Sequence, residues 1–224
     1  MHLARVEGTD VVRRRADSLQ LAVLALLADG PLHGYEVRRR LDVRLGAFRA
    51  LSYGTLYPCL RQLQTAGWVE ETTQARVAGT VAPRRTRVTY ALTAPGRERL
   101  AQLLEEAGPD AWEDDAFGVR FALFTRVAPR TRLRILQGRR TRLLERLEQL
   151  SHSIDRAQAL VDEYALEAQR HGLATVRAEV DWLDGLIEAE ERQPPGPADR
   201  RPDQQDQHDP GQQLPGDHRD GERP

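Results

Sequence analysis

A short stretch that begins at residue 52 carries the side chains best suited to hold a ligand. Four hydroxyl groups and one guanidinium group lie within it, on Ser52, Tyr53, Thr55, Tyr57 and Arg61. Such groups donate hydrogen bonds to phosphate oxygens and base edges, and an arginine can also reach guanine. These residue types therefore predict a nucleic-acid contact. As an alternative, Tyr53 and Tyr57 could pack against the rest of the domain from the flanks of a helix.

The same stretch has the pattern of an amphipathic helix. Leu56, Leu60 and Leu63 recur at i, i+4 and i+7, so they form one narrow apolar face. Ser52 is a suitable N-cap, and Gly67 suits the left-handed residue that often ends a helix. The opposite face is small and polar with a single charge, whereas a solvated helix usually carries Glu and Lys there. This favours a recognition helix that enters the major groove, and the alternative is an ordinary core helix.

Helices and a hairpin are predicted around this stretch. The predicted elements are a helix that starts at Asp17 or Ser18 and stops at Asp29-Gly30-Pro31, a helix from His33 to about Leu45, the helix at 52–66, strands at 68–72 and 87–92, and a helix capped by Thr93. This order is that of a winged helix-turn-helix, in which the hairpin is the wing. Three arginines in or beside the wing loop are predicted phosphate contacts, with a solvated charge run as the alternative; they are Arg84, Arg85 and Arg87.

Composition restricts the class of protein. The 224 residues carry 33 basic side chains, all of them Arg, against 34 acidic ones. Residues 1–107 hold 16 Arg against 11 Asp and Glu, so positive charge is concentrated in the half with the hydroxyl-rich stretch. The single cysteine excludes an intrachain disulfide and fits the cytoplasm. We expect no membrane span, because no apolar run is long enough. We expect no secretory signal, because the basic residues 1–16 lead into an amphipathic segment and not into an apolar core with a cleavage site.

The sequence predicts no enzyme, no metal site and no cofactor. Six histidines occur, but none pairs with another at ligand spacing on a helix, and no Gly-rich phosphate loop follows a strand. Asp114 and Asp115 are adjacent and would diverge on a helix, so they make a poor acid–base pair. We expect His33 to order the start of the second helix, and Cys59 to be a small buried side chain.

A long helical region is predicted after an acidic hinge at 108–115. A helix from about Asp115 to Val127 precedes it, and apolar residues then recur with 3-4 spacing from Leu133 to residue 168. This spacing predicts one coiled-coil helix over 130–169, about 60 Å long, that ends at His171-Gly172 before a shorter helix runs back. The seam residues expected to join two copies are Leu133, Leu136, Leu143, Leu147, Leu150, Ile154 and Val161.

Four segments are therefore expected. They are a basic leader at 1–16 that is mostly solvated, a winged domain at 17–107, a helical dimerisation domain at 112–192 and a disordered tail at 193–224. The tail contains seven Pro, four Gly and only two aliphatic side chains, so it cannot bury enough surface to fold. The expected fold class is mainly α, with a small β-hairpin wing.

Four motifs in this order resemble the PadR family of bacterial transcriptional regulators. They are Leu19-Gln-Leu-Ala-Val-Leu-Ala-Leu-Leu27, Pro31-Leu-His-Gly-Tyr-Glu36, Ser52-Tyr-Gly-Thr-Leu-Tyr-Pro58 and Tyr90-Ala-Leu-Thr-Ala-Pro-Gly96. The resemblance covers residues 18–106, and 112–192 resembles the longer helical region of the subgroup that is similar to virulence-gene activators. The resemblance implies a dimer that binds palindromic promoter DNA, mostly as a repressor. Some members of the family release the DNA when they bind phenolic acids or other small aromatic molecules. Two departures are the proline in Thr93-Ala-Pro-Gly96, where the family usually has Thr-Glu-Ala-Gly, and a long wing loop.

We therefore expect a cytoplasmic, homodimeric, sequence-specific DNA-binding repressor. Its expected partners are double-stranded palindromic promoter DNA, a second copy of the chain and, from the resemblance, a small aromatic effector. The rival hypothesis is a coiled-coil interaction module whose winged domain binds protein, because the outer face of the third helix is weakly charged. The C-terminal aromatic residues would form either an effector cleft or, as we favour, the dimer core; they are Trp112, Phe117, Phe121, Phe124, Tyr164 and Trp182.

Overall fold

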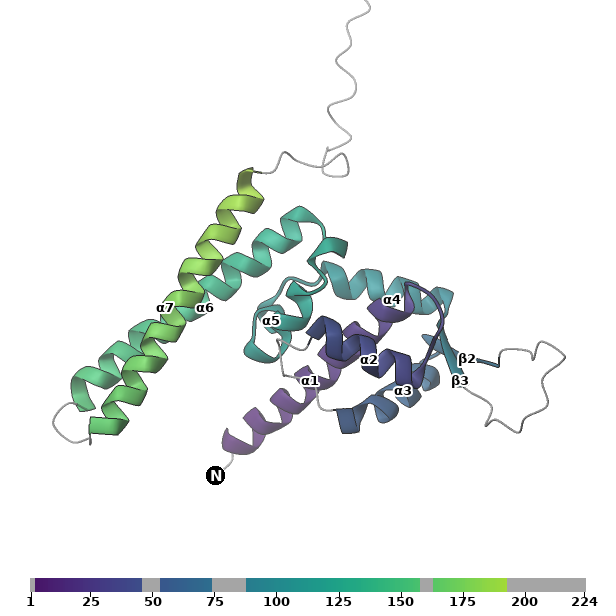
Figure 1. Ribbon diagram of the computed structural model, residues 1–224, viewed down its shortest axis with the longest axis horizontal. Coiled ribbons are helices and arrows are strands. Elements are labelled where there is room, and N and C mark those ends of the chain that lie inside the picture. The colour runs from purple at the N-terminus through teal and green to yellow at the C-terminus, as the bar shows by residue number, and fades with distance from the viewer. Residues whose placement is uncertain (1–2, 46–52, 74–87, 158–162, 193–224) are drawn as a thin grey trace, which may run out of the picture. The chain divides into compact units, whose positions relative to one another are not determined.

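The computed structural model describes residues 3–45, 53–73, 88–157 and 163–192 (Figure 1). The N-terminal elements are α1 (Leu3–Leu27), β1 (Leu32–His33), α2 (Gly34–Leu45), a 3₁₀ turn (Tyr53–Thr55), α3 (Leu56–Thr65), β2 (Val69–Thr73), β3 (Val88–Leu92) and α4 (Ala94–Glu105). The C-terminal elements are a 3₁₀ turn (Pro109–Ala111), α5 (Asp114–Phe121), a 3₁₀ turn (Phe124–Arg126), α6 (Pro129–Ala157) and α7 (Glu163–Arg192). No helix in these ranges is long and apolar enough to cross a membrane.

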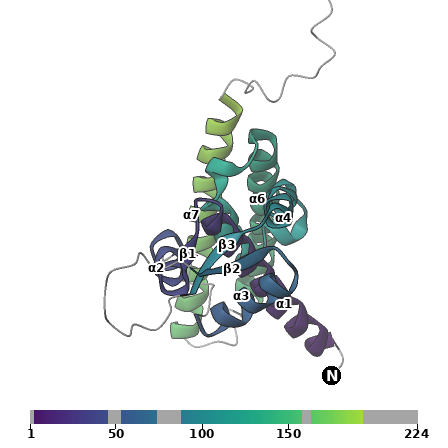
Figure 2. The ribbon, with the colours of Figure 1, turned by 90° about the vertical axis from the view of Figure 1, so that its right-hand side faces the viewer.

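The wing belongs to a three-stranded antiparallel sheet in which β3 lies between β1 and β2 (Figure 2). Val69 of β2 pairs with Leu92 of β3, and Thr73 pairs with Val88. The two strands are consecutive, so they form the hairpin that the sequence predicted. The helices before and after them complete a winged helix-turn-helix, and this fold class is confirmed.

The recognition-helix candidate α3 is anchored by the face that periodicity predicted. Leu56, Leu60 and Leu63 are all buried, in one core cluster with Val23 of α1 and Val37 of α2. Burial of the whole apolar stripe fixes the rotation of the helix about its axis. The polar side of α3 is therefore the side that remains exposed.

The first helix begins much earlier than predicted. It starts at Leu3 and runs to Leu27, whereas we expected a start at Asp17 or Ser18. Ser18 is buried in the middle of the helix and so does not cap it. Residues 3–16 of the expected leader thus extend the first core helix, because no residue at 16–18 breaks the hydrogen-bonded backbone.

The long C-terminal helix is in fact two helices. α6 ends at Ala157 and α7 begins at Glu163, so the prediction of one continuous helix over 130–169 was wrong. Arg132 contacts Glu190, and Arg139 contacts Glu179, so residue numbers rise along one helix as they fall along the other. The two helices are therefore antiparallel, and Figure 1 shows them side by side. α6 is about 44 Å long rather than 60 Å.

The predicted helix end at His171-Gly172 was also wrong, because both residues lie inside α7. Gly172 has open space where a side chain would project, so nothing near it requires a glycine. The shorter seam predicted on the returning helix does face the core, since Val176, Val180 and Leu183 are buried.

A second core cluster holds α5, α6 and α7 together within one chain. Leu136 and Leu143 are almost fully buried in it, and Ile154 is buried outside this cluster. Leu147 and Leu150 are only partly buried against it. Several residues of the predicted seam thus pack inside the chain, because α7 folds back onto α6.

A buried arginine links these elements. Arg139 of α6 donates to the carbonyl oxygen of Trp112 at 3.1 Å, to Glu179 of α7 at 2.8 Å and to Asp114 at the start of α5. Its guanidinium group also lies 5.3 Å from the ring centroid of Phe117. A buried cation needs such partners, so Arg139 fixes how α5 sits on the helical pair.

Candidate nucleic-acid interface

The exposed side of α3 carries three of the predicted contact residues. Thr55, Tyr57 and Arg61 are all exposed, and the ten residues of α3 include no acidic side chain. Arg61 is the single charge on this helix. The surface that α3 offers is therefore hydroxylated, small and weakly positive, as the sequence indicated.

The helix itself begins later than expected. α3 starts at Leu56 with Thr55 in the capping position, and the 3₁₀ turn from Tyr53 precedes it. Ser52, the predicted N-cap, lies outside the described residues, as does the side chain of Tyr53. The predicted wing contacts Arg84, Arg85 and Arg87 also fall outside them.

The C-terminal end of α3 is tied to the wing and to α4. Gly67 has a φ of +73°, which is the left-handed conformation predicted for it. The Thr93 hydroxyl donates to the Gly67 carbonyl oxygen at 2.7 Å and accepts from the Gly96 amide at 3.1 Å. A β-carbon at Gly96 would lie 2.9 Å from the Trp68 carbonyl carbon, so only glycine fits there. The Thr-Ala-Pro-Gly motif thus caps α4, as predicted, and fixes the base of the wing.

His33 contacts the wing more than the helix that follows it. Its Nδ1 atom lies 2.9 Å from the Thr89 hydroxyl and 3.3 Å from the Val88 carbonyl oxygen, both in β3. His33 also belongs to β1, a strand that the sequence did not predict. We expected His33 to order the start of α2, whereas its hydrogen-bonding contacts connect β1 to the wing strand.

Cys59 is a core residue, as predicted. Its side chain is buried on the inner side of α3, and this burial raises the pKa of the thiol to about 12. A thiol with that pKa is protonated at neutral pH and is a poor nucleophile or ligand. Among the described residues, no group of three or more His, Cys, Asp or Glu side chains could hold a metal ion.

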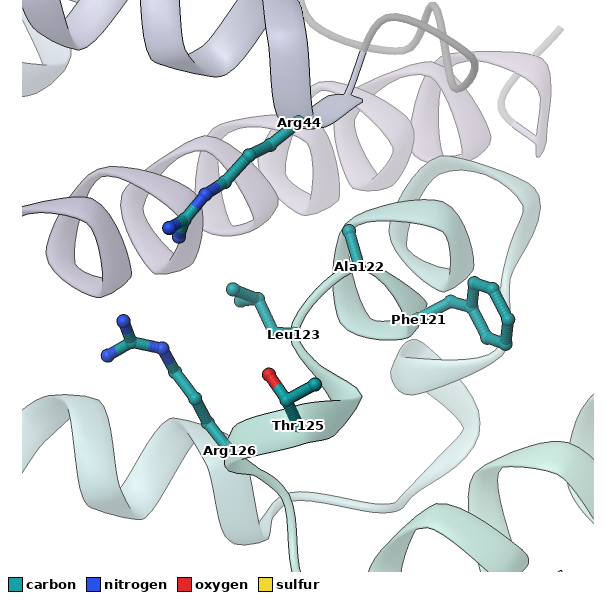
Figure 3. Close-up of a pocket in the computed structure, with 6 residues that line it drawn as sticks. All are labelled: Arg44, Phe121, Ala122, Leu123, Thr125 and Arg126. Carbon is teal, nitrogen blue, oxygen red and sulfur yellow. The ribbon is translucent and has the colours of Figure 1, made fainter.

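A hollow of about 440 Å³ lies beside Arg44, at the end of α2, and the segment from Phe121 to Arg126 (Figure 3). Figure 3 shows the two guanidinium groups on the same side of the hollow, with the Phe121 ring turned away. Asp29 accepts hydrogen bonds from both Arg44 and Arg126. Partial burial alone would raise the pKa of Asp29, but these two arginines outweigh it and lower the pKa.

The aromatic residues of the C-terminal half pack mostly against one another. Phe121 lies 5.1 Å from both Phe124 and Trp182, and Phe117 lies 6.3 Å from Trp182, measured between ring centroids. These contacts occur within one chain, where the rings fill space between α5, the following turn and α7. Tyr164 is not part of this group, since 88% of its surface is exposed.

The winged helix-turn-helix fold agrees with the family match of the N-terminal domain. Residues 23–102, from the C-terminal end of α1 to α4, match the transcriptional regulator PadR-like family. This N-terminal domain is therefore similar to those of PadR-like transcriptional regulators.

Individual relatives cover more of the chain. The probable transcriptional regulator Rv1176c of Mycobacterium tuberculosis is 26% identical over 188 residues, which are 77% of this chain and 97% of that protein. The crystal structure of Bacillus subtilis PadR in complex with operator DNA is 21% identical, covers 77% of this chain and 98% of its own, and has a TM-score of 0.36. The same protein in complex with p-coumaric acid is 20% identical, covers 78% and 99%, and has a TM-score of 0.35.

Proposed function

We propose that the protein is a homodimeric repressor that binds palindromic promoter DNA in the cytoplasm. The observation that carries the proposal is the exposed side of α3, which presents Tyr57 and Arg61 and lacks acidic residues, in a domain of the PadR-like family. A face of this kind can approach a polyanion closely. The N-terminal end of α3 would enter the major groove, with hydroxyl groups donating to phosphates or bases.

Dimerisation would use the surface that one chain leaves uncovered. Two packed helices bury only one side of each, so an isolated pair keeps apolar surface in water. Leu133, Leu147 and Leu150 of the predicted seam are partly exposed on α6, and 42% of the Trp182 surface is exposed on α7. A second copy packed on this side would set two α3 helices about 34 Å apart, the distance between successive turns of one DNA groove.

A small aromatic effector would bind in the hollow between Arg44 and Arg126. Its volume of about 440 Å³ falls within the range of small-molecule sites, and its two guanidinium groups suit an anionic substituent. Such a ligand would compete with Asp29 for the arginines and loosen the contact between α2 and the turn that leads into α6. The spacing of the two recognition helices would then change, and the complex with DNA would weaken.

Replacing three arginines tests this function. The variant with Arg61→Gln, Arg84→Gln and Arg85→Gln should no longer retain genomic DNA fragments, while light scattering still gives the mass of a dimer. A matched variant with Arg170→Gln, Arg177→Gln and Arg192→Gln removes the same charge from exposed positions of α7 and should retain DNA. The rival function, a winged domain that binds protein, requires that the unchanged protein retain no DNA.

A further inference from the structure

A cleft lined by three tyrosines lies beside the recognition helix. It has a volume of about 580 Å³ and lies between the first turn of α2, α3 and the base of the wing. We call it the tyrosine cleft; its lining residues are His33, Gly34, Tyr35, Glu36, Tyr57, Val88 and Tyr90. Of these, only Tyr57 was predicted from the sequence as a DNA contact.

Two motifs that are distant in the sequence meet in this cleft. A β-carbon on Gly34 would lie 3.2 Å from Tyr57 Cε1, which is tighter than most packed contacts, and in ordinary contact with Tyr90 Cε2 at 3.5 Å. The glycine therefore lets the Tyr57 ring lie against the first turn of α2. Tyr90 is buried and forms the floor, while His33 bonds to Thr89 and holds the wing strand beside it.

The phenol rings at the rim are unusually exposed. Of the residue surface, 73% is accessible on Tyr35 and 55% on Tyr57, and Val88 next to them is also exposed. Single exposed apolar residues are common, but a contiguous group around a hollow often marks a binding surface. A phenol offers such a surface both an apolar ring and a hydroxyl donor.

The charges around the cleft favour a polyanion. Glu36 is the one acidic residue in the lining, and it accepts hydrogen bonds from Arg39 and Arg40, each at 3.0 Å. These three side chains together carry a net positive charge. On the other side, Arg61 is near enough to Tyr90 to oppose the rise in pKa that burial and Glu71 cause in that tyrosine.

We propose that the tyrosine cleft seats the sugar–phosphate backbone of the operator, and that Tyr35 is a backbone contact together with Tyr57. Each hydroxyl donates to a phosphate oxygen, and the ring faces pack against the deoxyribose. The inference rests on the proposed DNA-binding function and assigns to it a residue outside the recognition helix. A neutral hydroxyl releases no counterion, so Tyr35 adds affinity without adding to the salt dependence.

Fluorescence anisotropy with a labelled fragment of the protein's own operator tests the proposal at several salt concentrations. Tyr35→Phe should bind about tenfold more weakly at every salt concentration, because a hydrogen bond to a charged group is lost. The slope of log affinity against log salt should stay unchanged, whereas Arg61→Gln should reduce it by about one. Tyr164→Phe, which removes a hydroxyl from an exposed tyrosine of α7, is the matched control and should bind like the unchanged protein.

Operators with a single neutral methylphosphonate locate the contact. At one phosphate in each half-site, the methylphosphonate should lower the affinity of the unchanged protein for the operator. The affinity of Tyr35→Phe should not change, because that variant lacks the hydroxyl that bonds to this phosphate. Equal affinities of Tyr35→Phe, Tyr164→Phe and the unchanged protein would contradict the proposed contact between the tyrosine cleft and the DNA backbone. The proposed DNA-binding function would not be affected by that result. An unchanged protein that binds no DNA would contradict the proposed function and the cleft with it.

Discussion

Arg126 donates a hydrogen bond to the carboxylate of Asp29, so the turn before α6 is joined to the end of α1. Arg44 of α2 binds the other carboxylate oxygen at 3.1 Å. One side chain thus connects two helices of the winged domain to the segment that leads into the helical pair. Any change in the angle of α6 against the winged domain must break or rotate this contact.

The Asp29 contact predicts a specific dependence of stability on pH. Its two arginines hold the pKa of Asp29 below the usual 3.8, so the contact stabilises the fold above pH 3.8 and is lost as pH falls through the lower folded-state value. Asp29→Asn should therefore lower the unfolding free energy near neutral pH by less than about 1 kcal/mol, since the groups are partly exposed. Urea unfolding between pH 2.5 and 7 measures this difference, which should shrink in acid. A difference that persists unchanged at the lowest pH would contradict the assigned partners.

Gly138 predicts a loss of stability on substitution by alanine. It lies inside α6, where a β-carbon would be 2.7 Å from Trp112 Cζ3. Alanine normally favours a helix by about 1 kcal/mol over glycine, but crowding the indole ring should cost about 1–3 kcal/mol. We expect Gly138→Ala to lower the unfolding free energy and to change the tryptophan fluorescence. A stabilised variant would show that the Trp112 ring does not pack on α6.

Gly172 predicts the opposite result. It lies inside α7 with open space around it, so Gly172→Ala should raise the unfolding free energy by up to about 1 kcal/mol. If the helix instead ended there in a left-handed residue, as the sequence suggested, alanine would be strained and the protein would become less stable. Thermal unfolding of the two glycine variants side by side distinguishes these cases.

Cys59 should act as a reporter of the packing of α3. Burial raises its pKa to about 12, so a thiol reagent near pH 8 should label the native protein only as fast as α3 opens. The raised pKa also makes the stability of the fold depend on pH. The contribution of the protonated thiol is fully present below its usual pKa of 9.0 and is lost as pH rises toward 12. Rapid labelling of the folded protein at pH 8 would contradict the burial of this residue.

In the winged domain, the sequence correctly predicted the features that depend on local periodicity and capping. The Leu56, Leu60 and Leu63 stripe, the left-handed Gly67 and the Thr93 cap all depend on neighbours within a few residues. β1 escaped prediction because two residues are too few to show alternation, and their pairing with β3 is non-local. The extension of α1 was missed because Ser18 has the chemistry of an N-cap although it lies inside a helix.

In the C-terminal half, the repeat pattern predicted neither where α6 ends nor what packs on its apolar side. The 3-4 spacing continues through residues 158–162, which contain neither Gly nor Pro, so the pattern carried no sign that α6 ends at Ala157. Periodicity shows which side of a helix is apolar, but not whether its partner is another copy or the same chain. The buried Arg139 was likewise not predictable, because its partners lie on two other segments, at 112–117 and in α7.

Recognition of specific DNA by the α3 face can be tested by comparing the binding of two DNA fragments. Anisotropy titrations should compare a fragment from upstream of the protein's own gene with a scrambled fragment of equal length and composition, in the same buffer at physiological salt. We predict binding to the upstream fragment that is at least about 1,000-fold tighter. Equal affinities for the two fragments would show that the α3 face does not recognise a specific sequence.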